Sequence, residues 1–163
     1  MVETTGGFSS LGLERESAAL ELLSLSIAEA LDIGGIALVL GTERSLPISI
    51  EVHVGTWVVF HASLPGAKPE HDSWLARKAR VVLATGNSTM LERVWAQEAE
   101  VDWYEFKGLP EATHAIHGGG VPLNVKGLGH VGTLLISGLP QVEDHLLAIE
   151  VISEFLARKG ELQ

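Results

Sequence analysis

The chain has 163 residues, 46% of them hydrophobic, and a formal net charge of −10, which predicts one soluble domain with a sizeable core. The negative charge argues against nucleic acid or an anionic membrane surface as a partner, because both need a basic footprint. The sequence contains no cysteine, which excludes disulfides, thiolate nucleophiles and cysteine-based zinc or iron–sulfur sites.

The N-terminal segment MVETTGGFSSLG has neither the basic region nor the apolar region of a secretory signal. No stretch of the sequence reaches the roughly 18 consecutive apolar residues that a membrane span needs. We therefore expect a cytoplasmic protein. Residues 1–12 are predicted to form a loose arm and residues 13–163 a single domain.

The first half of the chain predicts one helix followed by three strands. Apolar residues at helical spacing predict a helix over residues 13–33, ended by Gly34-Gly35. Apolar runs or clean alternation predict three strands, over residues 36–40, 48–54 and 57–62.

The last two of these strands should form a hairpin around Gly55-Thr56, with glycine in the first turn position. A two-residue turn pairs Val54 with Trp57 and Ile50 with His61. His61 is then expected on the apolar face as a hydrogen-bonded core histidine.

The middle of the chain is expected to be mainly helical. Pro69 and the acids after it predict the start of a helix that ends before Gly86-Asn87. A second helix is predicted from Ser88 or Thr89 to Glu98, with Thr89 and Glu92 as a capping box. Residues 101–106, in which aromatic side chains alternate with acids, are predicted to be extended.

The last part of the chain repeats the pattern of strands followed by a helix. Strands are predicted over residues 112–116, 121–125 and 130–137, and Pro122 favours an edge position for the second. A final helix is predicted over residues 142–159, with Gly160 as its cap. Runs of strands separated by short turns and followed by helices indicate an α+β fold with antiparallel pairing.

The sequence Gly127-Leu128-Gly129-His130-Val131-Gly132 matches G-x-G-x-x-G, the dinucleotide fingerprint. That fingerprint must open a helix, whereas here it leads into the β-rich residues 133–136. We therefore interpret it as a turn with close strand packing. His114 and His117 should lie on opposite faces of a strand, so no chelating pair and no metal site is expected.

Two glycine-rich corners are candidates for a binding site, because glycine lets a backbone approach a ligand or another chain closely. The first is Gly118-Gly119-Gly120, preceded by His117, which could donate to a bound anion or simply hydrogen-bond its own loop. The second runs from Ser137 to Pro140 and leads into the last helix.

Two further groups of polar residues extend these candidates. Asp144-His145 could form an acid–base pair, or a helix-cap acid beside a buried neighbour. Arg77, Lys78 and Arg80 form the one dense basic cluster of the sequence. They could contact a carboxylate or phosphate, or they could be a solvated helix face or part of inter-subunit salt bridges.

Six stretches taken in order resemble the haem-degrading domain family: FHASLPG (60–66), WLARK (74–78), HGGGVP (117–122), VG (131–132), SGLP (137–140) and DH (144–145). That family includes haem-binding sensors and glycolate-operon companion proteins, and the likeness is to its short, cytosolic, uncharacterised branch. The resemblance implies a profilin-like antiparallel sheet of about five or six strands flanked by helices. It also implies assembly into homodimers or larger oligomers, and a small ligand such as haem.

These observations favour a protein that binds a small molecule, either haem or another anionic ligand, at the two corners. The alternative is a non-enzymatic oligomeric scaffold or partner-binding module. An enzyme that uses Asp144-His145 is a third hypothesis, but no catalytic residue is assigned. The ten residues predicted to bind the ligand are His117, Gly118, Gly119, Gly120, Ser137, Gly138, Asp144, His145, Arg77 and Lys78.

Overall fold

The computed structural model describes residues 5–161. Its helices are α1 (Ser10–Ala19), α2 (Ile27–Glu43), α3 (Glu70–Thr85), α4 (Thr89–Glu98), α5 (Trp103–Lys107) and α6 (Gln141–Lys159). Its strands are β1 (Ser49–Val54), β2 (Trp57–Ser63), β3 (Gly120–Val125) and β4 (Gly129–Ser137). None of the described helices has the length and apolar character needed to cross a membrane.

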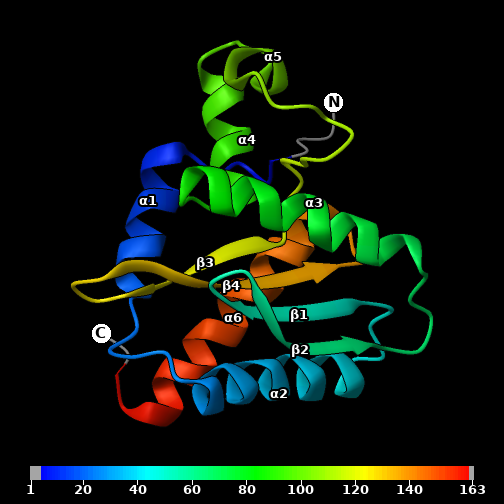
Figure 1. Ribbon diagram of the computed structural model, residues 1–163, viewed down its shortest axis with the longest axis vertical. Coiled ribbons are helices and arrows are strands. Elements are labelled where there is room, and N and C mark those ends of the chain that lie inside the picture. The colour runs from blue at the N-terminus through cyan, green and yellow to red at the C-terminus, as the bar shows by residue number, and fades with distance from the viewer. Residues whose placement is uncertain (1–4, 162–163) are drawn as a thin grey trace.

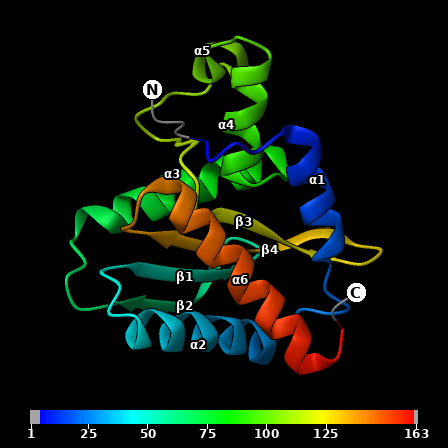
Figure 2. The same ribbon diagram turned by 180° about the vertical axis from the view of Figure 1, so that it is seen from behind.

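The strands form one antiparallel sheet in the order β2-β1-β4-β3. Helix α3 lies over one face of the sheet, and α2 and α6 cover the other (Figures 1 and 2). The main apolar core lies between the sheet and the α2–α6 layer. Alternation along β1 explains this arrangement, because Ile50 and Val52 are fully buried there while Glu51 and His53 point to the opposite face.

Several predictions for this fold are confirmed within one or two residues. They are the α+β class with antiparallel pairing, the hairpin around Gly55-Thr56, the helices that became α3, α4 and α6, and the strands that became β3 and β4. Strand β3 lies at an edge of the sheet, as Pro122 indicated. Residues 10–12 of the predicted arm belong to α1, and residues 1–4 lie outside the described part of the chain.

The predicted helix over residues 13–33 and the predicted strand over residues 36–40 are wrong. Two helices occupy this region, and α2 continues through Gly34-Gly35 to Glu43. Gly34 lies within the helix and does not end it. A Cβ atom at this position would overlap the ring of Phe60 on β2. The absence of a side chain thus lets α2 pack closely against the sheet.

Two other extended segments were also predicted wrongly, so the described residues form four strands rather than five or six. Residues 103–107 form the short helix α5, whose start is capped by the side chain of Asp102. Residues 112–116 belong to no strand. In that segment the Ala115 N–H donates to the Arg77 carbonyl, and the Ile116 N–H donates to Tyr104 Oη.

A bulge between Val52 and His53 corrects the predicted hairpin register. Val54 pairs with Trp57 as predicted, but Ile50 pairs with Ala62, and His61 lies opposite Glu51. The prediction of a core histidine is therefore wrong: His61 is exposed, and its Nδ1 lies 2.9 Å from the Glu51 carboxylate.

Glu29 closes a capping box at the start of α2 and is 8% exposed. Its carboxylate accepts hydrogen bonds from Ser24 Oγ and Ser26 N–H, and it lies 3.3 Å from Lys159 Nζ. Burial acts to raise the pKa of Glu29. The hydrogen bonds from Ser26 and Ser24 and the Lys159 contact outweigh burial and lower this pKa to about 2.

We predict that Glu29→Gln lowers the free energy of unfolding at pH 7 by about 1–2 kcal/mol. Because the folded-state pKa is depressed, the carboxylate stabilises fully above its unfolded value near 4.5, and this contribution is lost as pH falls toward 2. Urea unfolding at pH 7 and pH 3.5 should therefore show the two proteins converging at the lower pH. Glu154→Gln, in an exposed pair with Arg158, is the control and should change little. A loss that is equal at both pH values would contradict the assignment.

Candidate functional site

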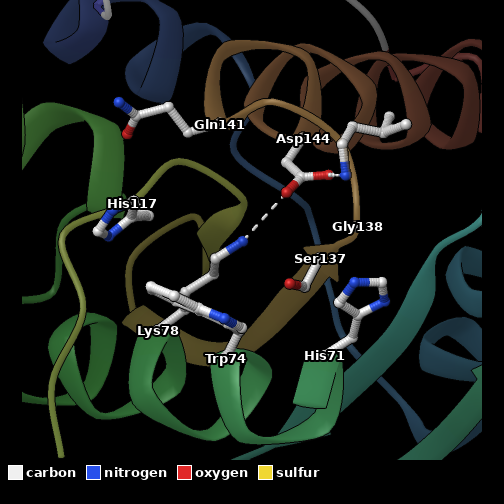
Figure 3. A pocket seen from close by; sticks show the side chains of 9 residues that line it. His71, Trp74, Lys78, His117, Ser137, Gly138, Gln141 and Asp144 are labelled. Atoms are coloured by element: carbon white, nitrogen blue, oxygen red, sulfur yellow. Dashed lines mark hydrogen bonds and ion pairs between the residues drawn. The ribbon is translucent and has the colours of Figure 1, made fainter. Parts of the chain in front are cut away.

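A cleft of about 200 Å³ lies between the first half of α3, the chain before β3 and the second glycine-rich corner (Figure 3). Of the first corner, Gly118, Gly119 and Gly120 do not line it. Helix α3 contributes His71, Trp74 and Lys78, and the chain just before β3 contributes His117. The remaining lining residues come from the end of β4 and the start of α6: Ser137, Gly138, Leu139, Gln141 and Asp144. Segments far apart in the sequence thus converge on one concave site.

A buried ion pair lies in this cleft. Lys78 and Asp144 are each 2% exposed, and Lys78 Nζ lies 3.2 Å from Asp144 Oδ2. Lys78 Nζ also donates to the Ile136 carbonyl at 2.9 Å, and Asp144 Oδ1 accepts from the Leu139 N–H at 3.0 Å. The pair therefore joins α3 to the corner between β4 and α6 (Figure 3).

Burial acts on both members of this pair. Burial raises the pKa of Asp144 to about 6, although the Lys78 charge and the Leu139 and Gly138 amides oppose it. Burial also lowers the pKa of Lys78, against the attraction of Asp144. At pH 7 the two groups form an ion pair, because both the Lys78 ammonium and the backbone amides of Leu139 and Gly138 stabilise the Asp144 carboxylate. Both shifts nevertheless reduce the free-energy difference between this ion pair and the state in which the amine and the carboxylic acid are both neutral.

The three consecutive glycines allow the chain to close over this pair. A Cβ atom on Gly118 would clash with the Gln141 carbonyl oxygen. Gly119 has a φ of +125°, and a Cβ atom there would lie 2.8 Å from Lys78 Nζ and clash with the Ile136 carbonyl oxygen. The close approach expected of this corner is therefore made to the protein's own backbone and to Lys78.

The predicted capping box of Thr89 and Glu92 at the start of α4 is wrong, because Thr89 bonds to Gly120 instead. The Gly120 N–H donates to Thr89 Oγ1 at 3.1 Å, so Thr89 holds the glycine corner. Ser88 caps α4 instead, by accepting from the Leu91 N–H. Glu92 accepts from the indole Nε1–H of Trp103 at 3.0 Å.

His117 packs edge-on against Trp74, with their ring centroids 4.7 Å apart. Its Nδ1 is buried and has no hydrogen-bond partner among the described residues. Burial, followed by the positive charges of Arg93, Lys78 and Arg77, lowers the pKa of His117 to about 4. The imidazole is therefore neutral at pH 7, and three cations act on it.

The predicted basic cluster divides into separate contacts. Only Lys78 lines the cleft. The Arg77 guanidinium lies 4.4 Å from the centroid of the Trp74 ring and donates to the Glu111 carbonyl. Arg80 donates to the Thr113 carbonyl. Arg77 therefore supports the indole that forms one wall of the cleft.

His145 lies outside the cleft, so the hypothesis of an Asp144–His145 acid–base pair is wrong. Its Nε2 lies 2.9 Å from Glu16 Oε1 on α1, and its ring packs edge-on against Phe8 at 5.4 Å. Consecutive residues of an α-helix point about 100° apart, so neighbours in sequence need not face the same space. Asp144 faces the cleft, whereas His145 fastens α1 to α6.

Sequence reasoning missed three lining residues outside the two corners, His71, Trp74 and Gln141, and it did not list Leu139 within the second corner as a binding residue. The first two carry a usable signal, because His71, Trp74 and Lys78 stand three and four residues apart and so share one face of a helix. For Gln141, the position at the N-terminus of the last helix, directly after the second corner, was the available signal.

A sequence model described as haem-degrading protein HbpS-like matches residues 25–153. The chain belongs to this family. A UPF0303 protein of Streptomyces avermitilis is 36% identical over 146 residues, which cover 90% of each chain. A UPF0303 protein of Rhizobium johnstonii is also 36% identical over 146 residues, again 90% of each chain.

Solved structures of more distant sequence share the fold of this family. The Ybr137w protein superposes with a TM-score of 0.83 at 24% identity, covering 91% of this chain and 88% of that chain. PduOC, solved as a complex with haem, gives a TM-score of 0.66 at 20% identity, covering 79% of this chain and 93% of that chain. At these identities the likeness shows a shared fold.

The buried ion pair makes a testable prediction about stability. Lys78→Met leaves the Asp144 carboxylate buried without its cation, and should lower the free energy of unfolding by about 3–5 kcal/mol. The double variant Lys78→Met/Asp144→Asn should recover most of that loss, because the amide oxygen can still accept from the Leu139 N–H. Urea unfolding measures both variants, and Lys126→Met in an exposed turn is the control. A double variant as unstable as the single one would refute this account of the pair.

Proposed function

We propose that the protein binds a small anionic ligand, most simply a carboxylate, in the cleft between Trp74, His117 and the corner that begins at Ser137. The observation that carries this proposal is the Lys78 ammonium in the cleft, with the charges of Arg77 and Arg93 nearby; burial and then these three cations lower the His117 pKa to about 4. Such a group of cations is unusual in a chain of net charge −10. An anion would gain from it without requiring any rearrangement of the cleft.

The other walls suit the remainder of such a ligand. The rings of Trp74 and His117 offer a flat apolar surface, and the Ser137 hydroxyl can serve as donor or acceptor. The N-terminus of α6, a helix of 19 residues, contributes its positive dipole end beside Gln141. These contacts favour a carboxylate attached to a compact, partly apolar body.

Haem is the ligand that the family description raises. The residues of this cleft do not fit a whole haem, because about 200 Å³ lies below the roughly 300–1,000 Å³ of pockets for drug-sized ligands, and a tetrapyrrole exceeds such ligands. The Nδ1 of His117, which has no hydrogen-bond partner among the described residues, is the nearest candidate for an iron ligand, but it is buried beside the indole of Trp74. We therefore assign a smaller anion to the cleft.

NMR titration of the His117 ring protons tests the proposal, with benzoate as probe and benzamide as its neutral counterpart. Benzoate should give a saturable shift and should raise the His117 pKa from about 4, because a bound anion stabilises the imidazolium. Benzamide should bind at least about tenfold more weakly, equivalent to 1.4 kcal/mol.

The double variant Lys78→Met/Asp144→Asn should lose the response to benzoate, and Lys126→Met should keep it. Equal responses to benzoate and benzamide would refute an anion site. A parallel titration with hemin addresses haem: a saturable Soret shift that competes with benzoate and is lost in the double variant would assign haem to this cleft instead.

We also propose that the protein forms a homodimer through the outer face of α2. Ile27, Leu31 and Val39 are 41%, 46% and 48% exposed, and they share one helix face with Gly35. A Cβ atom at Gly35 would meet nothing within 4 Å. This exposed apolar stripe, at positions i, i+4, i+8 and i+12, supports the scaffold alternative.

Charge complementarity favours a second copy of the same chain as the partner of this face. The stripe borders a groove of about 430 Å³ that is also lined by Asp32 on α2 and Arg158 on α6. In the proposed dimer a two-fold axis crosses the stripe and Asp32 of each copy pairs with Arg158 of the other, so one attractive pair is made twice.

Light scattering and sedimentation at micromolar concentration test this dimer. Leu31→Asp should give a monomer, because it would bury an unpaired carboxylate at the interface. Asp32→Arg should weaken association, and adding Arg158→Asp should restore it, because the swapped charges again face each other. Leu128→Asp is the control, in a turn where Leu128 is 76% exposed. A wild-type monomer, or a dimer indifferent to Leu31→Asp, would rule this face out.

A further inference from the structure

Lys78 differs in its surroundings from every other lysine of the chain. Lys68, Lys107, Lys126 and Lys159 are exposed, whereas Lys78 is 2% exposed and lines a cleft. An ammonium has three N–H donors, and among the described residues Lys78 uses two, toward the Ile136 carbonyl and Asp144 Oδ2. The third N–H has no partner among these residues, and Lys78 is one of the residues that line the cleft.

We propose that Lys78 binds small α-oxo acids covalently, by forming an imine between its Nζ and the carbonyl carbon of the ligand. This inference rests on the proposed function, because the carboxylate of the α-oxo acid would occupy the positive cleft. The same site then holds both reacting groups close together, which converts a bimolecular reaction into an effectively unimolecular one.

The contact between Lys78 and Asp144 supplies the neutral amine that this reaction needs. An amine attacks a carbonyl only after losing its proton, and Asp144 Oδ2 lies 3.2 Å from Nζ, within reach of that proton. Burial lowers the pKa of Lys78 and raises that of Asp144 to about 6, so both shifts favour this transfer. The exposed lysines lack this buried environment, even where a carboxylate lies nearby, as Glu29 does beside Lys159.

The step balances with no other reactant. The Nζ lone pair forms the C–N bond, the carbonyl π pair moves to oxygen, and Asp144 gives that oxygen a proton. The nitrogen returns one proton to Asp144, which passes it to the hydroxyl as water departs and the C=N bond forms. The net change converts ammonium, carboxylate and ketone into iminium, carboxylate and water.

The product also preserves the charge arrangement of the buried site. A positively charged iminium takes the place of the ammonium beside Asp144, so the carboxylate keeps a cation at the same position. A buried carboxylate without its partner would be strongly destabilising, and this route never leaves one unpaired. The ion pair can therefore serve both the fold and the chemistry.

Reductive trapping tests the inference. The native protein is treated with pyruvate and sodium cyanoborohydride, followed by intact mass measurement and peptide mapping. We expect a single adduct at Lys78, formed about tenfold or more faster than at any exposed lysine, since each unit of lowered pKa gives about tenfold more neutral amine. Lactate, which lacks the carbonyl, should compete with trapping and form no adduct itself.

Two variants separate the outcomes. Lys78→Met/Asp144→Asn should abolish the adduct, and Lys126→Met should leave it unchanged. Adducts spread over the exposed lysines, with Lys78 unmodified, would overturn the imine. If benzoate and lactate still bind in that case, the anion site stands and only the covalent step fails. If neither anion binds and no adduct forms at Lys78, the proposed function fails as well.

Discussion

The ion pair between Lys78 and Asp144 is the constraint on which the site and much of the fold depend. A charged group can be buried only if its hydrogen-bonding capacity is met, so the elements around the pair must converge accurately. Lys78 requires the carbonyl of Ile136 at the end of β4, and Asp144 requires the amide of Leu139 just beyond it. Helix α3, strand β4 and helix α6 are therefore positioned by the same four groups.

The glycine-rich corner follows from this convergence. Three glycines in a row cost conformational entropy, and that cost needs a local cause. Any side chain on Gly119 would crowd the Lys78 ammonium or the Ile136 carbonyl, and one on Gly118 would clash with the start of α6. The corner can lie over the ion pair only without side chains, and this placement brings the preceding residue, His117, into the cleft wall.

The sequence predicted those elements whose cause is local. Alternation and turn chemistry gave the β1–β2 hairpin, and capping residues with helical spacing gave α3, α4 and α6. It failed at residues 36–40, where an apolar run has no period and the preceding Gly34 is explained by Phe60, a residue distant in sequence. The bulge at Val52–His53, which moved His61 to the exposed face, likewise has no local sequence signal.

The site shows the same division between local pattern and tertiary contact. The sequence indicated both corners, because consecutive glycines mark places where the backbone passes close to another group. The residues that complete the cleft could be assigned only from the structure. Asp144 and His145 are adjacent in sequence, but one completes a buried ion pair in the cleft while the other binds Glu16 on α1. His71 and Trp74 could be predicted as cleft residues only after Lys78 was known to lie in the cleft, because they share its face of α3.

The positive potential of the cleft persists because its cations are held by carbonyl oxygens. Arg77 donates to the Glu111 carbonyl and Arg93 to the Ile116 carbonyl, so neither guanidinium is neutralised by these contacts. Asp144 offsets the charge of Lys78 alone. A backbone carbonyl fixes the position of a cation without cancelling its charge, so the field of both arginines still reaches His117. Burial and these cations together keep His117 neutral at pH 7.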